Sequence, residues 1–282
     1  MTEEEIRARI MAGRAFMGQW ETEENQDFVS DQNKKLPQPP LVKAAMRREQ
    51  IPLPTDFGEL ELINDTLRLF GERKSSRVYT EEPMTFRELS FLLWVSQGVK
   101  GLRGRAYATL RTVPSAGARH PYECYLLIRR VEGLTPGAYH YLPMEHALEL
   151  LCPEEDLKEK FGKDLKSLIP AVMHGQAFTG KASAAFFYAM NAYRAEWRYG
   201  IRSHRVALMD AGHIVENLYL ACAALKLGVC AVGAMDMKLG NALFELDGTE
   251  EFLVYSAACG TISEANAQAE QDFYAFVKKE NL

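Results

Sequence analysis

The sequence predicts an α+β fold in which a mixed sheet is flanked by helices. Residues 122–131 alternate like a strand, and residues 137–142 and 146–151 resemble a hairpin around Pro143-Met144. Helical patterns separate other strand-like segments, above all the long apolar pattern between Val206 and Leu225. Because hairpin and helical connections both occur, the strands are expected to form one mixed sheet with helices packed against it.

The stretch 202–235 is the predicted centre of the fold. Nearly every side chain from Val206 to Leu225 is apolar or small, which predicts a helix buried on most sides. Lys226 and Gly228 predict the helix stop, with Gly228 in the left-handed conformation. A short buried strand, 229–232, is expected next, and Gly233-Ala234 would let the backbone approach a flat or bulky group. An ordinary core with a tight turn is the alternative interpretation.

The N-terminal third divides by composition. Residues 4–20 have helical periodicity, whereas 21–54 are polar and then rich in proline, which predicts an extended arm. The arm is equally compatible with a linker and with a segment lying along a folded surface. We therefore expect an N-terminal helix and arm over 1–65 and a main domain over 66–282.

Further elements follow in order along the main domain. Thr85 and Glu88 form a capping-box pattern at the start of a helix over 85–99, and 98–104 is expected to be a flexible basic loop. The other predicted helices are 56–70, 153–168, 238–246 and 263–279, and the other predicted strands are 182–190 and 252–258. The segment 191–199 is short and rich in aromatic residues. Asp236 is expected to cap the helix that follows it.

Composition excludes several classes of protein. A formal net charge of −5 over 282 residues argues against a general nucleic-acid binder. The five cysteines have no CxxC spacing, so neither a disulfide framework nor a zinc site is favoured, and no metal ligands are assigned. No apolar run reaches the length of a membrane span, and the acidic N-terminus lacks a signal region, so a cytoplasmic protein is expected. Neither GxGxxG nor a P-loop pattern is present.

Two segments suggest ligand contacts. Residues 73–77 combine three cations with two hydroxyls, a composition suited to a phosphate monoester, although a solvated basic loop would look the same. Residues 111–121 are turn-rich and small, with Ser115 as a potential helix cap, and would expose backbone donors to a ligand.

Taken together, RKSSR at 73–77, PSAGARHP at 114–121, RYGIRSHR at 198–205, DAGH at 210–213, NLYL at 217–220 and LGVCAVGAMD at 227–236 resemble the nitroreductase family. Within it, the chain is most similar to the SagB-type dehydrogenase branch, and the resemblance covers about residues 67–260. It implies an FMN-dependent oxidoreductase built as an intertwined homodimer, with each flavin bound where two subunits meet.

The resemblance also implies roles for individual residues. Arg73, Lys74, Ser75 and Arg77 match the segment that binds the FMN phosphate. Pro114, Ser115, Ala116 and Gly117 match the segment that reaches the flavin from the partner subunit. Val232, Gly233 and Ala234 match the turn along the isoalloxazine near N5. These roles suit the chemistry, since a phosphate needs cations and reduced flavin needs fixed dipoles.

The chain departs from the family pattern at three places. Ala118 and His120 replace the usual Asn and Gln after the PSAG segment. Residues 260–265 carry no basic residue, which leaves more of the phosphate charge to Arg73, Arg77 and either Arg202 or Arg205. Arg198-Tyr199 replaces a Lys-Tyr pair, and an arginine cannot act as a general base. Tyr199 remains a candidate acid, with Arg198 beside it, whereas His213 is expected to be a core histidine.

Three functions agree with these features. The first is transfer of a hydride from a reduced donor such as NAD(P)H through flavin N5 to a nitroaromatic or quinone. The second is a SagB-like dehydrogenase that desaturates a modified peptide or another organic substrate. The third is a flavin-holding protein without turnover. The cofactor carries the redox chemistry in the first two functions, so neither strictly requires a catalytic side chain.

Overall fold

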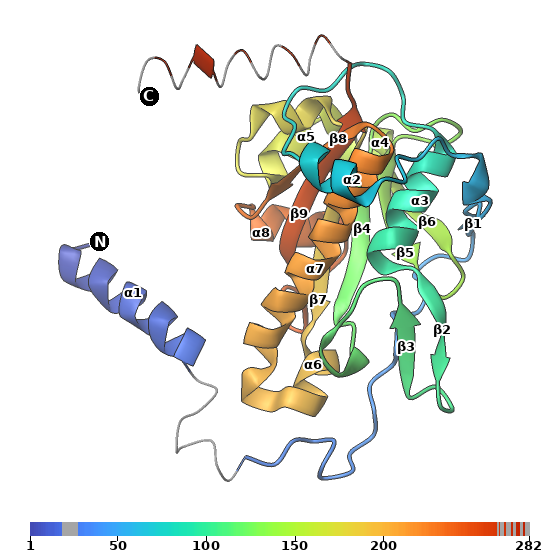
Figure 1. Ribbon diagram of the computed structural model, residues 1–282. Coiled ribbons are helices and arrows are strands. Elements are labelled where there is room, and N and C mark those ends of the chain that lie inside the picture. The colour runs from blue at the N-terminus through green and yellow to red at the C-terminus, as the bar shows by residue number, and fades with distance from the viewer. Residues whose placement is uncertain are drawn as a thin grey trace.

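A seven-stranded sheet forms the centre of the computed structural model, which describes residues 1–18, 28–263 and single positions between 265 and 279 (Figure 1). Its order is β1-β6-β5-β4-β7-β9-β8. In that order the strands are Ile51–Pro52, Ala147–Pro153, Gly137–Leu142, Tyr122–Ile128, Ala184–Asn191, Glu251–Thr261 and Leu227–Val232. The predicted α+β fold, with its sheet flanked by helices, is confirmed.

The strands pair antiparallel throughout this sheet. Within the described residues, the parallel pairing expected of a mixed sheet is found in one isolated bridge between Met84 and Val131, outside the named strands. The chain runs from β7 through helices into β8, which resembles a parallel crossover in the sequence. However, β9 lies between β7 and β8 and pairs antiparallel with both. Therefore β9, the last strand in the sequence, separates β7 from β8 in the sheet.

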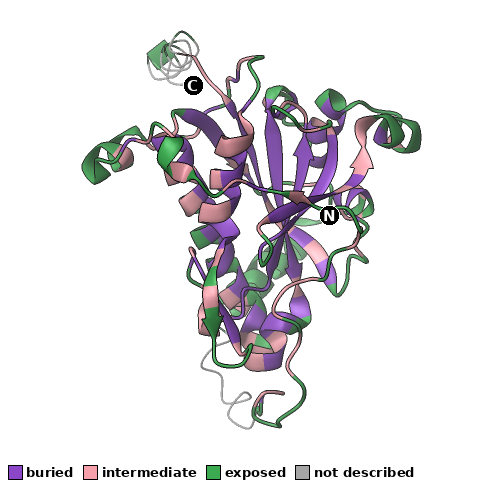
Figure 2. Cartoon of the chain, turned by 90° about the vertical axis from the view of Figure 1, so that its right-hand side faces the viewer, coloured by how far each residue is buried: buried purple, intermediate pink, exposed green. Residues whose placement is uncertain are grey.

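Helices cover the two faces of the sheet, whose strands are largely buried (Figure 2). The buried apolar residues form two clusters, one on each face. On one face lie α3 (Phe86–Gln97) and α7 (Ser203–Ala224), which pack against alternate residues of β4 such as Cys124 and Leu126. On the other face lie α4 (Glu154–Phe161), α5 (Leu165–Val172) and α8 (Met237–Leu243). The period-2 alternation of the strands thus supplies two apolar cores.

The remaining helices are peripheral. These are α1 (Glu3–Gly18), α2 (Thr66–Glu72), α6 (Ala192–Tyr199) and 3₁₀ turns at Phe57–Glu59, Ala116–Ala118, Ala177–Lys181 and Gly200–Arg202. No α1 residue is buried. The predicted helix over 263–279 lies mostly outside the described residues, and its described positions are helical. No described helix is long and apolar enough to cross a membrane.

Two predicted helix caps are confirmed, and both depend on residues that are close together in the sequence. The capping box of Thr85 and Glu88 is present at the start of α3, and Asp236 caps α8 through the Leu239 amide. Two long predicted helices are broken instead. The one over 56–70 becomes a 3₁₀ turn and α2, which Asp65 caps, because the Ile63 amide bonds the Ala224 carbonyl. The one over 153–168 divides at Gly162, which is left-handed.

Two further predictions were wrong in detail. Residues 98–104 do not form a loop, because β2 (Val99–Arg103) pairs with β3 (Ala108–Arg111) as a hairpin. At the end of α7 the left-handed residue is Lys226, with φ 58°, and Gly228 lies inside β8. A side chain at Gly228 would collide with Ile262 and Ser76, so its glycine serves close packing.

The described part of the Pro-containing arm lies along the folded surface and is not a free linker. β1 extends the sheet by pairing with β6. Upstream, the Lys43 amide donates to Glu123 Oε1 over 2.8 Å, and the Met46 amide donates to Glu149 Oε1 over 3.0 Å. Both carboxylates are buried, so each satisfies part of its hydrogen-bonding capacity with the backbone of the arm.

A histidine lies between these carboxylates. His140 Nδ1 is 2.7 Å from Glu149 Oε1, and its Nε2 is 3.6 Å from Glu123 Oε2. Burial alone would lower the pKa of His140, but the hydrogen bonds and charges of Glu123 and Glu149 raise it above its ordinary value. For Glu149, burial alone would raise the pKa, but the hydrogen bonds from His140 and from the backbone of the arm outweigh burial and lower the pKa. The arm is therefore held by a buried charged cluster.

We predict that Glu149→Gln lowers the free energy of unfolding by roughly 3 kcal/mol at pH 7, because it breaks a buried, charge-assisted network. Because the folded-state pKa of Glu149 is depressed, its contribution is present above the ordinary value of 4.5 and is lost as pH falls through the folded-state pKa. Urea unfolding of wild type and variant should therefore converge at acid pH. The exposed Glu145→Gln is the matched control, and an equal loss in both variants would contradict the account.

Candidate functional site

The basic segment 73–77 runs along the outer edge of the sheet. It follows α2 directly, and the Ser76 amide donates to the Val229 carbonyl of β8 over 2.8 Å. Ser76 is buried, whereas Lys74 and Arg77 are exposed. The segment is therefore fixed by its backbone on β8 and presents basic side chains at the surface.

Tyr219 of α7 joins this segment to β8. Its hydroxyl lies 2.9 Å from Ser75 Oγ and accepts a hydrogen bond of 2.9 Å from the Ala231 amide. The guanidinium of Arg73 lies over the Tyr219 ring, 5.5 Å from its centroid, in a cation–π contact. One tyrosine thus holds two residues of the predicted phosphate segment and the residue that precedes the turn 232–234.

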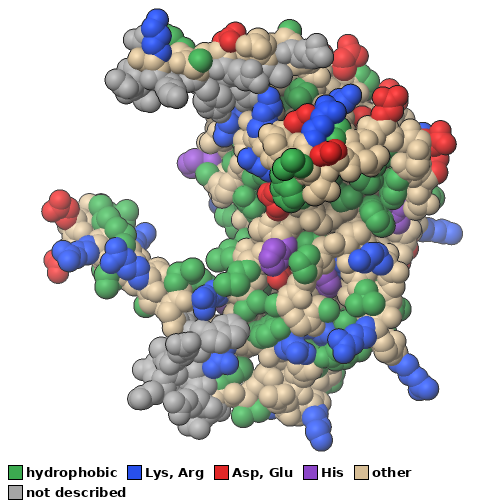
Figure 3. All heavy atoms as spheres, viewed as in Figure 1, with side chains coloured by type: hydrophobic (Ala, Val, Ile, Leu, Met, Phe, Trp, Pro, Cys, Tyr) green, Lys and Arg blue, Asp and Glu red, His purple; other side chains and the backbone are tan. Residues whose placement is uncertain are grey.

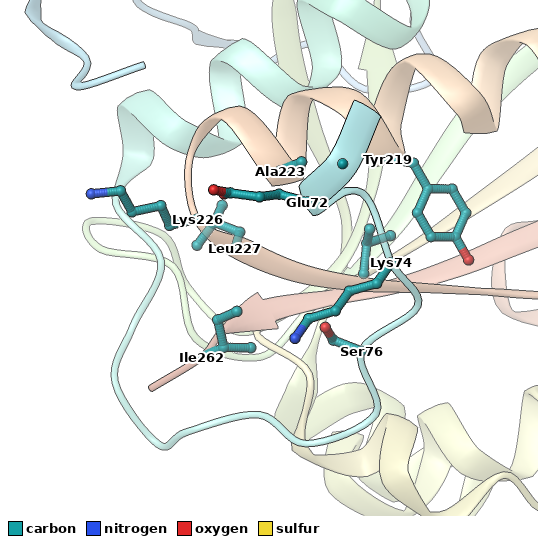
Figure 4. A pocket seen from close by; sticks show the side chains of 10 residues that line it. Glu72, Lys74, Ser76, Tyr219, Ala223, Lys226, Leu227 and Ile262 are labelled. Carbon is teal, nitrogen blue, oxygen red and sulfur yellow. The ribbon is translucent and has the colours of Figure 1, made fainter. Parts of the chain in front are cut away.

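A pocket of about 360 Å³ adjoins this cluster (Figure 4). Lys74 and Ser76 point into the same space, and Tyr219 closes one side of it. Of the three cations at 73–77, Lys74 lines this pocket, whereas Arg73 lies over the Tyr219 ring. The remaining lining residues are Gly71, Glu72, Ala223, Lys226, Leu227, Val229 and Ile262.

The turn 232–234 follows immediately on β8. Val232 is buried, and its carbonyl accepts a 2.7 Å hydrogen bond from Ser256 Oγ. Gly233 and Ala234 are exposed, and a Cβ built on Gly233 would meet no atom within 4 Å. In the described chain this turn therefore faces open space, with its backbone fixed from behind.

The segment 114–117 is held elsewhere, by Asp210 in the first half of α7. Ser115 Oγ donates to Asp210 Oδ2 over 2.6 Å, and the Ala116 amide donates to Oδ1 over 3.0 Å. Ser115 therefore does not cap the 3₁₀ turn at 116–118 with its side chain, as expected from the sequence. Instead it accepts from the His120 amide over 2.9 Å, which closes the loop on itself.

Arg198 and Tyr199 lie against this segment. Gly117 has φ 56°, and a Cβ there would stand 2.5 Å from Arg198 Nε and 2.6 Å from Tyr199 Oη. Only glycine permits both the left-handed backbone and this contact. The predicted catalytic pair and the predicted partner-facing loop are thus adjacent in one chain.

The predicted residues therefore form two groups, one at each end of α7. The Tyr219 hydroxyl joins residues 73–77 to Ala231, the residue before the turn 232–234. Residues 114–117 and 198–199 meet near Asp210. Nine residues of helix separate the two anchors, which is roughly 13 Å of axial rise. Arg202 directly precedes α7 and Arg205 lies in its first turn, at the Asp210 end.

The central helix is less buried than predicted. Leu208 and Met209 are 51% and 49% exposed, and hydrophobic side chains are visible over α7 in Figure 3. His213 is also exposed, so its interpretation as a core histidine was wrong. These side chains are exposed because one side of the first half of α7 has no neighbouring element among the described residues.

Sequence reasoning missed the anchors Tyr219 and Asp210. Both are hydrogen-bonding side chains on an otherwise apolar helix, which was the available signal. However, Ser75, a partner of Tyr219, and Ser115, a partner of Asp210, are each more than 90 residues away in sequence. Burial raises the pKa of Asp210, although the bonds from Ser115 and Ala116 oppose that shift. Among the described residues, no group of three or more His, Cys, Asp or Glu side chains could hold a metal ion.

We expect Tyr219→Phe to lower the free energy of unfolding by about 1–3 kcal/mol, because the Ala231 amide and Ser75 hydroxyl lose a shared partner. Chemical denaturation measures this effect. Tyr255→Phe on β9 is the control, since the Tyr255 hydroxyl makes no hydrogen bond within the described part of the chain. Equal stabilities of the two variants would show that the Tyr219 hydroxyl does not fix this cluster.

Known proteins resemble this chain over the region that carries both groups of residues. The model of the nitroreductase family matches residues 71–261, which include both groups of site residues. The Methanocaldococcus jannaschii protein MJ1384, which carries a nitroreductase name, is 35% identical over 185 residues, covering 66% of this chain and 84% of that protein. A Ralstonia eutropha crystal structure, also named as a nitroreductase, is 25% identical with a TM-score of 0.57, covering 81% of this chain and 95% of that one.

The Escherichia coli microcin B17-processing protein McbC is also similar, with 32% identity over 124 residues. This match covers 42% of each chain, so the chain spans less than half of McbC. It supports the predicted link to the SagB-type dehydrogenase branch. Because the family model covers more than half of the residues, the chain belongs to the nitroreductase family, a family of oxidoreductases.

Proposed function

We propose that this protein is an FMN-dependent oxidoreductase that passes a hydride from NAD(P)H through flavin N5 to a small acceptor such as a nitroaromatic or quinone. The contact that carries the proposal is the one made by Tyr219, whose hydroxyl joins Ser75 of the basic segment to Ala231, the residue that leads into the turn 232–234. These are the two segments that the family resemblance assigns to the flavin phosphate and to the redox edge of the ring.

The residues fit such a cofactor. Arg73, Lys74, Ser75 and Arg77 would hold the phosphate, because guanidinium and hydroxyl groups suit a dianion. Val232, Gly233 and Ala234 would lie along the ring, where Gly233 leaves room for close approach of a flat group. The bound flavin would supply hydride transfer, while the protein fixes backbone dipoles around it and limits access of water.

A second subunit completes the proposed site. Pro114, Ser115, Ala116 and Gly117 form the loop that Asp210 holds, and Asp210 lies roughly 13 Å along α7 from Tyr219, in the half of the helix where Leu208 and Met209 are exposed. An intertwined homodimer would cover this apolar face and bring residues 114–117 of one subunit to the flavin held by the other. Arg198 and Tyr199 would then stand beside the acceptor as the candidate catalytic pair. A nicotinamide donor also suits the cytoplasmic location proposed for the protein.

A dehydrogenase of a modified peptide is the second candidate, favoured by the similarity to McbC, a microcin B17-processing protein. In that reaction, the substrate would lose a hydride and a proton. The arginine at position 198 cannot accept the proton, so another residue would have to do so. Release of a desaturated peptide, with no quinone reduction, would favour this candidate over the first.

The first test is flavin binding. The purified protein should be yellow or should bind added FMN, and anaerobic NAD(P)H should bleach it. A colourless protein that binds no FMN would overturn the proposal. Bound FMN that no nicotinamide donor reduces would instead indicate a flavin-holding protein without turnover.

Arg73→Ala should weaken FMN binding at least about tenfold, because a charge-assisted bond contributes about 1.5–3 kcal/mol. The same variant should change the affinity for riboflavin much less, since riboflavin lacks the phosphate. Arg68→Ala on α2 is the control, because Arg68 is exposed and pairs with Glu72. Fluorescence titration with both flavins measures the difference, and equal losses for the two would contradict the assignment of the phosphate segment.

Mixing two variants, each with one impaired segment, tests the shared site. Arg73→Ala impairs the phosphate segment. Gly117→Ala impairs the segment 114–117, because the new Cβ would collide with Arg198. In a mixed dimer one site carries both changes and the other carries neither, so an equal mixture should regain about a quarter of wild-type activity. A mixture no more active than its components would show that both segments serve the same flavin within one chain.

A further inference from the structure

Tyr107 lies in the turn between β2 and β3, and its hydroxyl receives two hydrogen bonds. Gln32 Nε2 donates over 3.0 Å, and Arg198 Nη1 donates over 2.8 Å. These partners come from the N-terminal arm and from α6, respectively. Three segments far apart in the sequence thus converge on one phenol oxygen.

The direction of both hydrogen bonds is fixed by Arg198. A guanidinium has only donors, so the neighbouring Gln32 must turn its oxygen toward it, and Arg198 Nη1 does donate to Gln32 Oε1 over 3.2 Å. The amide nitrogen of Gln32 then faces Tyr107 as a donor. With two donors on its oxygen, Tyr107 must direct its own proton elsewhere, and loss of that proton would leave an oxyanion already solvated by N–H groups.

The charges around Tyr107 act in the same direction. Arg119 lies over its ring, 4.8 Å from the centroid, and donates to the Tyr107 carbonyl over 2.8 Å. Within the described part of the chain, neither Arg119 nor Arg198 forms an ion pair with a carboxylate, in contrast to Arg194 with Glu123. Tyr199 also faces this cluster, with its ring 5.6 Å from the Arg198 guanidinium.

The pKa of Tyr107 reflects this balance. Burial raises it, but the Gln32 hydrogen bond and the positive charges of Arg198 and Arg119 outweigh burial, so the net shift is downward. By contrast, burial raises the pKa of Tyr122, Tyr125, Tyr139, Tyr141 and Tyr188. Tyr107 is thus set apart from the core tyrosines by its surroundings.

The same cluster adjoins the proposed flavin-facing loop. Arg119 Nε donates to the Gly117 carbonyl over 3.1 Å, and Arg198 Nε lies against Gly117. Resting on the function proposed above, we propose that Tyr107 is the proton donor to the acceptor, whose class is quinones and related carbonyl compounds. Arg198 and Gln32 are positioning residues that stabilise the phenolate left behind.

The step balances as follows. A quinone takes up one hydride, supplied by the reduced flavin, and one proton from Tyr107, which together convert it to the hydroquinone. The Tyr107 O–H bond breaks as the new O–H bond forms on the product. The phenolate is held by Arg198 and Gln32 until a proton from water restores it, and the net proton consumed comes from solvent.

The first experiment measures titration of Tyr107 without relying on activity. In the full-length protein labelled with ¹³Cζ-tyrosine, the resonance lost in Tyr107→Phe should titrate below the ordinary tyrosine pKa of about 10. Arg198→Met should move that titration to higher pH, and Tyr193→Phe on the exposed face of α6 should not. A Tyr107 resonance that titrates at or above 10, or ignores Arg198→Met, would overturn the proposal.

The second experiment separates the two half-reactions under anaerobic conditions. Tyr107→Phe should leave flavin reduction by NADH near the wild-type rate and slow reoxidation by 1,4-benzoquinone on the order of 10²-fold. In the wild type, reoxidation should fall as pH rises through the Tyr107 pKa, and Arg198→Met should shift that fall to higher pH. Tyr193→Phe should retain wild-type rates in both half-reactions.

The outcomes distinguish this proposal from the one on which it rests. A protein that binds no flavin overturns both. A protein whose flavin is reduced by NADH, but whose Tyr107→Phe variant reoxidises at the wild-type rate and pH dependence, overturns only the role of Tyr107.

Discussion

The hydroxyl of Tyr219 is the contact on which the site depends. It joins Ser75, which lies beyond the edge of the sheet, to Ala231 at the end of β8. Ser75 belongs to the proposed phosphate segment, and Ala231 directly precedes the turn that would lie along the ring. Since Tyr219 projects from the long helix α7, the relative position of the two segments is set by a packed core and not by either loop alone.

The length of α7 imposes a second constraint. Its first half holds the 114–117 loop through Asp210, and its second half holds the 73–77 segment through Tyr219. The two halves present different parts of the proposed site, and the exposed apolar side chains of the first half adjoin the loop. This arrangement suits a site that two copies of the chain assemble together, and it gives the arm a role through Gln32, which reaches Tyr107 and Arg198.

The sequence predicted the parts of the structure that depend on local patterns. Strand alternation, the Thr85–Glu88 capping box and the Asp236 cap depend on neighbouring residues, and all three are present. The grouping of 73–77 with 232–234 followed from family resemblance. The anchors themselves could not be predicted, because the contacts of Tyr219 and Asp210 link residues far apart in the chain. Similarly, the close packing of Gly228 against Ile262 and Ser76 depends on distant residues, and the left-handed residue at the end of α7 is Lys226 instead.

A crystal structure of the protein with FMN would test the central claim most directly. We expect the phosphate within hydrogen-bonding distance of Arg73 or Ser75, the N5 edge of the ring beside Gly233, and residues 114–117 of a second subunit against the same ring. A flavin bound away from Tyr219, or enclosed by the segments of a single subunit, would contradict this account.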